Sequence, residues 1–256
     1  MNNPSDDAPT NKVPSDSPVG IEGERGELVN VRNMLLVVLA FTSGFIDAIS
    51  FLGLAVFASV MTGNTVLLGL ALGTGNVPLG LGALLALVGY IGGVALGARI
   101  VDPSTIPQKI WPNAVTKAFV IEVLVLSMLA IGGFFAGSKP SALVLYTLVA
   151  FASTAMGVQS AAVNALGVSG ISTTYITGTW TSLVGSLARR RRPTTSRSKS
   201  KEILKTRLQA AVVVVYVLAA IVGGVMEINW SLKAAIIPVI AVGLVIAVAR
   251  IRITPR

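Results

Sequence analysis

The chain has 256 residues, of which 53% are hydrophobic and 12% are charged, and its net charge is +9. A soluble domain carries roughly 25% charged residues, so this composition excludes a soluble fold and indicates a multi-pass, all-α integral membrane protein. The chain contains no cysteine and no histidine. This excludes disulfides, thiol chemistry, Cys/His zinc sites and the commonest general base, and we expect no cofactor and no metal.

The first 30 residues are rich in Asn, Pro, Ser, Asp, Glu and Gly and contain no apolar run. This composition predicts a disordered polar tail over residues 1–30, followed by a transmembrane domain over residues 31–252. Because the tail lacks a basic segment followed by a short apolar core, we expect no cleavable signal peptide.

Six apolar segments are long enough to cross a hydrocarbon core of about 30 Å, which needs about 20 helical residues. They are Asn33–Leu54, Leu79–Ile100, Ala118–Ala136, Ser141–Leu166, Leu208–Met226 and Leu232–Ala249. Two shorter apolar segments, from about Phe57 to Leu72 and from about Thr173 to Leu187, carry polar residues near their starts. We expect these two to re-enter the membrane without crossing it, which gives about six transmembrane helices.

Basic residues favour this topology over one in which the short segments also cross. The segment 189–207 holds nine Lys and Arg residues, and the positive-inside rule predicts that it is a cytoplasmic loop. With six crossings, both termini and the loop Arg99–Lys117 also lie in the cytoplasm, and the outer loops carry little positive charge. The net charge is thus explained by topology, and we expect no nucleic-acid partner. The membrane is interpreted as the plasma membrane.

Two echoes indicate an internal repeat. Ala40-Phe41-Thr42-Ser43 is echoed by Ala150-Phe151-Ala152-Ser153, and Met61-Thr62-Gly63-Asn64-Thr65 by Ile176-Thr177-Gly178-Thr179. The predicted halves, 33–137 and 141–250, each hold a long span, a short segment and two long spans. An odd number of crossings per half makes the repeat inverted. Interrupted segments at matching positions of an inverted repeat are typical of a transporter's central site.

The candidate substrate or ion site consists of polar groups within these segments. Asp47 lies near the middle of the first span, where an acid costs about 2.5–3.5 kcal/mol on insertion scales, so it will not face lipid. It either binds a proton or cation or is a neutral packing residue. The clusters at the two short segments either cradle a solute or cap the helices. The candidates are Asp47, Thr62, Gly63, Asn64, Thr65, Gln159, Asn164, Thr177, Gly178 and Thr179.

Three further features have competing interpretations. Gln159 and Asn164 are more typical of hydrogen bonds between helices than of ligands. Gly89, Gly93 and Gly97, four residues apart, predict close helix packing within the chain, with a homodimer contact as the alternative. The run Arg189–Arg192 sets topology or, alternatively, binds anionic lipid.

These motifs resemble the YoaK-like membrane proteins, a family described as a domain of unknown function. The similar stretches are Gly44–Ala48 with Phe51, Met61–Thr65, Ala155–Gln159 and Thr173–Thr179, within roughly Asn33 to Arg252. The chain departs from the family at Ser160, where Asn is frequent, and at Asn164 and Ala165, where basic residues are frequent. The resemblance implies an integral membrane protein of several helices and no established substrate.

We therefore expect a small secondary transporter of unknown solute, with Asp47 coupling a proton or cation. The alternative is a passive channel or a structural membrane protein, in which the Thr/Gly/Asn clusters only cap and pack helices. An enzyme is not expected, because Asp47 and Glu122 are the only acids well inside the spans and nothing in the sequence brings them together. No phosphate-binding loop of the ATPase type is present.

Overall fold

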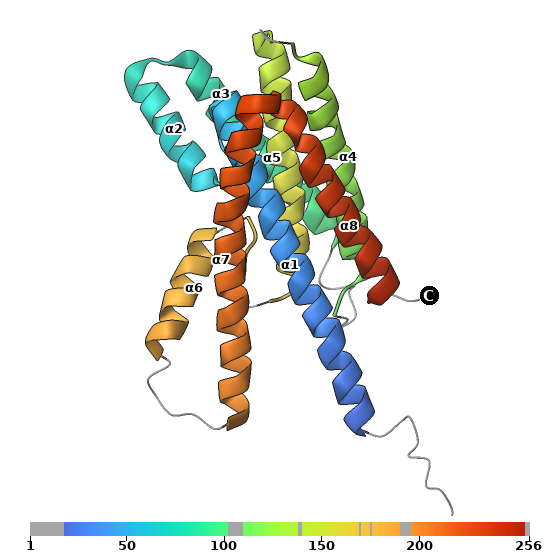
Figure 1. Cartoon of the computed structure of the whole chain (residues 1–256). Helices are drawn as coiled ribbons and strands as arrows, with labels where there is room; N and C mark the ends of the chain where they lie inside the picture. The colour runs from blue at the N-terminus through green and yellow to red at the C-terminus, as the bar shows by residue number, and fades with distance from the viewer. Residues whose placement is uncertain are drawn as a thin grey trace, which may run out of the picture.

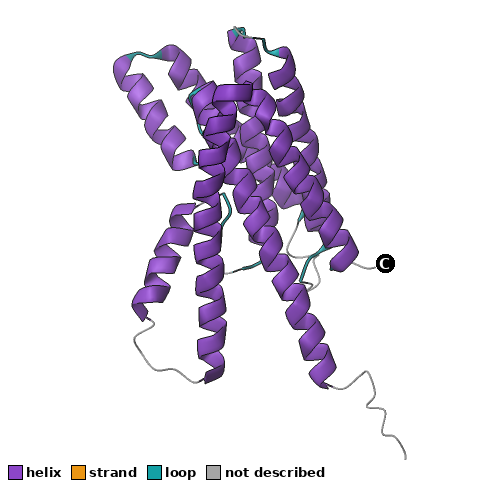
Figure 2. Cartoon of the chain, viewed as in Figure 1, coloured by secondary structure: helices purple, strands orange, loops and turns teal. Residues whose placement is uncertain are grey.

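The computed structural model describes residues 18–101, 110–137, 140–168, 170–174, 176–189 and 196–253. Within these residues the regular structure is helical, with no strand (Figure 2). The elements in chain order are α1 (Pro18–Leu54), α2 (Met61–Thr74), α3 (Val77–Ile100), α4 (Asn113–Phe135), α5 (Ala142–Ala165), α6 (Ile176–Arg189), α7 (Ser196–Trp230), the 3₁₀ turn η1 (Ser231–Ala235) and α8 (Ile236–Arg252).

Five helical stretches of the described chain are long and apolar enough to cross a membrane. They are Gly23–Leu54, Val77–Ile100, Asn113–Phe135, Ala142–Ala165 and Glu202–Arg252. The last has 51 residues, so a straight helix of that length would measure about 76 Å, far more than a bilayer core of about 30 Å. The chain instead reverses at η1, and α7 and α8 run in opposite directions (Figure 1).

The two short helices, α2 and α6, occupy corresponding places at opposite ends of the bundle. Each begins near the middle of the bundle and runs outward. Helix α2 runs toward the end that holds η1, and α6 runs toward the end where α1 begins (Figure 1). Each then turns back into the long helix that follows it, α3 or α7, and packs against it.

Helix packing pairs the first four helices with the last four. Helix α1 packs along α7 as α5 packs along α3, and α1 packs on α8 as α5 packs on α4. If α1–α4 are exchanged in order with α5–α8, the contact of α1 with α7 becomes that of α5 with α3. The contact of α1 with α8 likewise becomes that of α5 with α4. Helices α1 and α5 also touch, so the two halves meet along their first helices.

Glycines let the paired helices approach closely, and they do so in the same way twice. A Cβ on Gly44 would collide with the carbonyl oxygen of Tyr216 in α7, and a Cβ on Gly157 would collide with that of Tyr90 in α3. Aligning Gly44 with Gly157 differs by three residues from the alignment of Ala40 with Ala150 that the echo suggested. At the two short helices, in contrast, Asn64 and Thr179 make matching hydrogen bonds and are also aligned by the echo.

The glycine ridge Gly89, Gly93 and Gly97 faces α5. Cβ atoms on these residues would meet the backbone or side chains of Ala150, Thr154 and Ala161, among others. The ridge is therefore used for packing within the chain, and its face is not available to a second copy.

Two boundaries differ most from the sequence predictions. Helix α1 begins at Pro18, so residues 18–30 are helical where a disordered tail was predicted. Proline suits the first turn of a helix, and a helix that is already formed extends at little cost. For the same reason α7 begins at Ser196, inside the predicted loop 189–207. Residues 1–17 and 190–195 lie outside the described chain.

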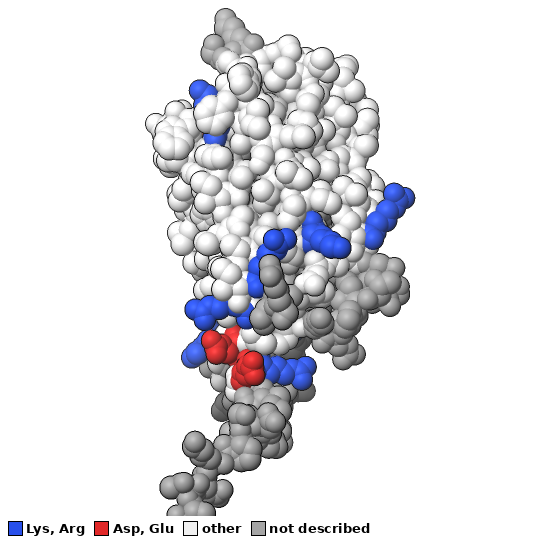
Figure 3. Space-filling model, turned by 90° about the vertical axis from the view of Figure 1, so that its right-hand side faces the viewer, with Lys and Arg blue, Asp and Glu red and all other residues white. Residues whose placement is uncertain are grey.

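Charged side chains of the described chain gather at one end. Figure 3 shows Lys, Arg and Glu near the end where α1 begins, below a broad uncharged surface. Lys233 lies at the opposite end, in η1. Among the residues whose side chains the structure describes, the basic residues at this end are Arg25, Arg32, Arg99, Lys117, Lys205, Arg207, Arg250 and Arg252.

Candidate functional site

Asp47, in the middle of α1, is the centre of a buried hydrogen-bond network. Its side chain is 3% exposed. Its Oδ1 accepts the Ser59 N–H at 2.7 Å, and its Oδ2 accepts the Ser59 hydroxyl at 2.5 Å and the Tyr216 hydroxyl at 2.6 Å. The Ala58 N–H also donates to the carboxylate. Partners of this kind lower the cost of burying an acid, and through them Asp47 holds the break before α2 against α7.

The linkers that precede α2 and α6 meet beside Asp47. The Ser59 hydroxyl lies 3.2 Å from the carbonyl oxygen of Thr174, 115 residues later in the chain. Both residues are buried, and each precedes a short helix by two residues. Irregular backbone of this kind is tolerated at membrane depth only where protein or water satisfies its polar groups.

Gln159, on α5, ties the second linker to α1. Its Nε2 lies 3.1 Å from the Leu39 carbonyl, 2.8 Å from Ser43 Oγ and 3.0 Å from Thr173 Oγ1. Gln159 Oε1 and Thr174 Oγ1 are buried and have no partner among the described residues. The centre therefore combines one carboxylate with two polar atoms that are free to bind another group.

One residue in each short helix binds both backbone groups of a residue in the preceding linker. Asn64 Oδ1 accepts the Phe57 N–H at 2.9 Å, and Asn64 Nδ2 donates to the Phe57 carbonyl at 2.7 Å. Thr179 Oγ1 accepts the Ser172 N–H at 3.1 Å and donates to the Ser172 carbonyl at 3.0 Å. Both residues are the fourth of their helix and bond the residue seven positions earlier, so the two linkers have the same construction.

The remaining cluster residues do not contact the centre. Thr62, Thr65 and Thr177 are exposed, and Thr65 bonds back to the carbonyl of Met61 within its own helix at 2.9 Å. The N-cap of α2 is Val60 and receives no side-chain hydrogen bond, so none of the cluster residues caps this helix. The two glycines, Gly63 and Gly178, are half-buried, and a Cβ on Gly63 would meet the ring of Phe57.

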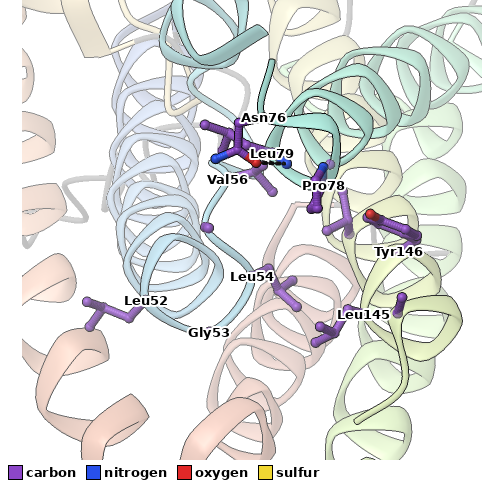
Figure 4. Close-up of a pocket in the computed structure, with 13 residues that line it drawn as sticks. Leu52, Gly53, Leu54, Val56, Asn76, Pro78, Leu79, Leu145 and Tyr146 are labelled. Carbon is purple, nitrogen blue, oxygen red and sulfur yellow. Dashed lines mark hydrogen bonds between the residues drawn. The ribbon is translucent and has the colours of Figure 1, made fainter. Parts of the chain in front are cut away.

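Two pockets lie near the two linkers. One, of about 450 Å³, is enclosed by the end of α1, the start of α3 and the start of α5, and Figure 4 shows Leu54, Asn76 and Tyr146 around it. The second, of about 160 Å³, is lined near the opposite end of α5 by Ser160 and Asn164, together with Ser172 of the second linker. Asn164 is therefore at a pocket and not at the centre.

Of the residues in this network and its linkers, the sequence prediction included Asp47, Asn64, Gln159 and Thr179. It did not include Ser59, Thr174 and Tyr216. The first two lie in the linkers, two residues before each short helix, and the matching echoes offered a signal for them. Tyr216 carried no such signal, because its bond to Asp47 joins residues 169 positions apart.

Glu122, the other acid expected inside a span, lies on α4, and neither of its oxygens has a partner among the described residues. No group of three or more His, Cys, Asp or Glu side chains able to hold a metal was found in the described ranges. A lipid contact was predicted at Arg189–Arg192, whose side chains lie outside the described part of the structure.

Comparisons with known proteins agree with the membrane architecture. A model of the family described as "Protein of unknown function (DUF1275)" matches residues 35–249. The chain is 36% identical over 198 residues to the UPF0700 transmembrane protein YoaK of Bacillus subtilis strain 168, over 77% of this chain and 84% of that protein. No solved structure matches. With its long apolar helices, the chain is thus an integral membrane protein.

Proposed function

The chain belongs to the family of proteins of unknown function DUF1275, as its motifs indicate, and we propose that it is a small secondary transporter. The observation that carries this proposal is the meeting of two broken segments at a buried carboxylate. The Ser59 hydroxyl contacts both Asp47 and the carbonyl of Thr174, so the two linkers and the acid form one polar centre.

The architecture we infer is an inverted repeat with six crossings and two re-entrant helices. Helices α1–α4 form one half and α5–α8 the other, with α2 and α6 entering from opposite sides. The matching contacts at Gly44 and Gly157 and the matching linker bonds of Asn64 and Thr179 support it. Inverted repeats of this kind place the substrate where interrupted helices meet.

We infer the orientation from the basic residues. Eight Lys and Arg residues whose side chains the structure describes lie at the end where α1 begins, and Lys233 lies at the other. By the positive-inside rule, the basic end faces the cytoplasm, together with both termini. The larger pocket then faces outward and the pocket at Ser160 faces inward, with the polar centre between them.

Asp47 is the proposed coupling residue. It is the only acid in the polar centre of the described chain, and its carboxylate can take up a proton or hold a cation. The hydroxyls of Ser59 and Tyr216 can rotate, so they can serve either state of the acid. A structural membrane protein or a passive channel remains the competing function, since the same bonds also fasten α1 to α7.

Labelling of single cysteines from each side tests this proposal, because the native chain has no cysteine. Ala55→Cys lines the larger pocket and Asn164→Cys the smaller one. Gly92→Cys is the matched control, since a side chain there meets no atom within 4 Å and faces lipid. A charged thiol reagent should label Ala55→Cys from outside, Asn164→Cys from inside and Gly92→Cys from neither side. Labelling of both pocket cysteines from one side would contradict the inverted arrangement.

A further inference from the structure

The first half of the protein contains a carboxylate-binding site that is filled by its own Asp47. The donors come from the linker before α2 and from α7: the N–H groups of Ala58 and Ser59 and the hydroxyls of Ser59 and Tyr216. The site lies at the N-terminal end of α2, where the helix dipole also favours negative charge. It shows which groups this fold uses to bind a carboxylate.

The second half places Ser160 where the first half has Asp47. Gly157 and Ser160 have the same three-residue spacing as Gly44 and Asp47, and both glycines pack on a tyrosine carbonyl. The match extends to the tyrosine side chains. Tyr216 donates its hydroxyl to Asp47, and Tyr90 donates its hydroxyl to Ser160 at 2.8 Å. The second half thus keeps the tyrosine donor but carries no acid of its own.

Thr174 supplies the donor that corresponds to Ser59. The bonds of Asn64 to Phe57 and of Thr179 to Ser172 align the two linkers, so that Thr174 and Ser59 fall at the same position. The Ser59 hydroxyl donates to Asp47, whereas Thr174 Oγ1 has no partner among the described residues, although Thr174 is 2% exposed. A buried hydroxyl without a partner is unfavourable, so a ligand that accepts its hydrogen bond is favoured at this position.

A pocket lies beside Ser160. Its volume is about 160 Å³, and Ser160, Asn164 and Ser172 supply its polar lining. An engineered protein cavity of about 150 Å³ holds a benzene molecule, so the pocket suits a ligand of about six non-hydrogen atoms. That is the size of an organic acid with two to four carbon atoms.

Asp47 lies against Ser59 in the first half, so the correspondence of the two halves places Thr174 toward Ser160 in the second. We propose that this second half-site, formed by Tyr90, Ser160 and Thr174 at the start of α6, binds the carboxylate of a small organic acid. The acid's carboxylate takes the place that Asp47 occupies in the first half. Its remaining atoms lie in the pocket between Ser160 and Asn164. Because the site contains no lysine or arginine among these residues, neutral hydrogen bonds and the α6 dipole provide the attraction.

This inference rests on the proposed transport function and specifies its substrate class and coupling. A carboxylate at Thr174 lies close to Asp47, since the Ser59 hydroxyl contacts both residues. Two negative charges at that separation in a buried site repel each other, so a proton on Asp47 favours binding of the acid. The expected result is symport of one proton with one carboxylate.

Thermal unfolding of the purified full-length protein, followed by tryptophan fluorescence, tests the site without relying on transport. The probes are the sodium salts of acetate, lactate and pyruvate, with sodium chloride and the neutral amide lactamide as controls. A carboxylate should raise the unfolding temperature in a dose-dependent manner that follows mass action, and the controls should not.

Three variants localise the effect. Thr174→Val keeps the shape and removes the hydroxyl, and should weaken binding by about 10- to 100-fold. Thr181→Val is the matched control on α6, because its hydroxyl is exposed and bonds only within the helix. Ser160→Asp supplies a tethered carboxylate, and should abolish the response to added acid while the protein stays folded.

The outcomes are distinct. A wild-type protein that responds to carboxylates no more than to chloride overturns the proposal, as does an unchanged response in both Thr174→Val and Ser160→Asp. If Thr174→Val fails to fold, Ser160→Asp alone decides. Should carboxylates bind while the sided labelling fails, the transport proposal is wrong and the binding site stands. Should the labelling succeed without carboxylate binding, only the substrate assignment is wrong.

Discussion

The two glycine crossings provide a quantitative test of the packing. In Gly44→Ala and Gly157→Ala, the new methyl group meets a carbonyl oxygen of the facing helix, Tyr216 or Tyr90. These carbonyls belong to the helix backbone and cannot rotate away, so the helices must separate. Overpacking of this kind costs about 1–3 kcal/mol, partly offset by about 0.5–1 kcal/mol from the helix preference of alanine.

The matched controls are Gly92→Ala and Gly243→Ala, whose new methyl groups meet no atom within 4 Å. They should stabilise the protein by about 0.5–1 kcal/mol. Because the helix preference of alanine is common to both classes, they should differ by the overpacking cost of about 1–3 kcal/mol, or roughly 2–12 °C in unfolding temperature for a chain of this size. Scanning fluorimetry of the purified variants measures this difference. If Gly44→Ala or Gly157→Ala melts together with the controls, the close crossing at that glycine is wrong.

Three further predictions concern single polar groups. Asn64→Leu leaves the N–H and the carbonyl of Phe57 without partners and should lower the free energy of unfolding by about 2–5 kcal/mol. The control Thr65→Val, at an exposed position, should change the free energy of unfolding by less than about 1 kcal/mol. Chemical unfolding of the two variants measures the difference. Glu122→Met removes a buried carboxyl that has no partner in the described chain and should raise the unfolding temperature; a lower one would reveal a structural role. Asp47→Asn should abolish carboxylate uptake into proteoliposomes while the protein still elutes as a single species, and unchanged uptake would remove Asp47 from the coupling step.

The helices themselves could be predicted from the sequence. Long apolar runs identified the spans, and the polar starts of the two short segments identified α2 and α6, because membrane helices depend on local composition and on punctuation by glycine and proline. The predicted ends lie close to the observed ends where a turn residue follows, as at Ile100, which precedes Asp102 and Pro103. They fail at Pro18 and Ser196, where polar sequence simply continues a helix that has already formed.

The polar centre could be predicted from the sequence only in part. Asp47 could be found because an acid inside a span is rare, but its partners Ser59 and Tyr216 are ordinary residues. They are recognised only by their hydrogen bonds to Asp47, 12 and 169 positions away in the sequence. The proposed repeat could not be aligned from the sequence alone. In apolar sequence a tetrapeptide such as Ala40–Ser43 finds a match easily, whereas the alignment that we propose rests on which glycine lies against a backbone carbonyl.

If the protein is a secondary transporter, as proposed, its polar centre opens alternately to the two pockets. We would test it by comparing labelling rates of Ala55→Cys and Asn164→Cys with and without Asp47→Asn, which imitates the protonated acid. Alternating access predicts that the rates change in opposite directions, because one change of shape opens one pocket as it closes the other. Rates that stay the same, or that rise together, would contradict the claim and favour a structural protein or a channel.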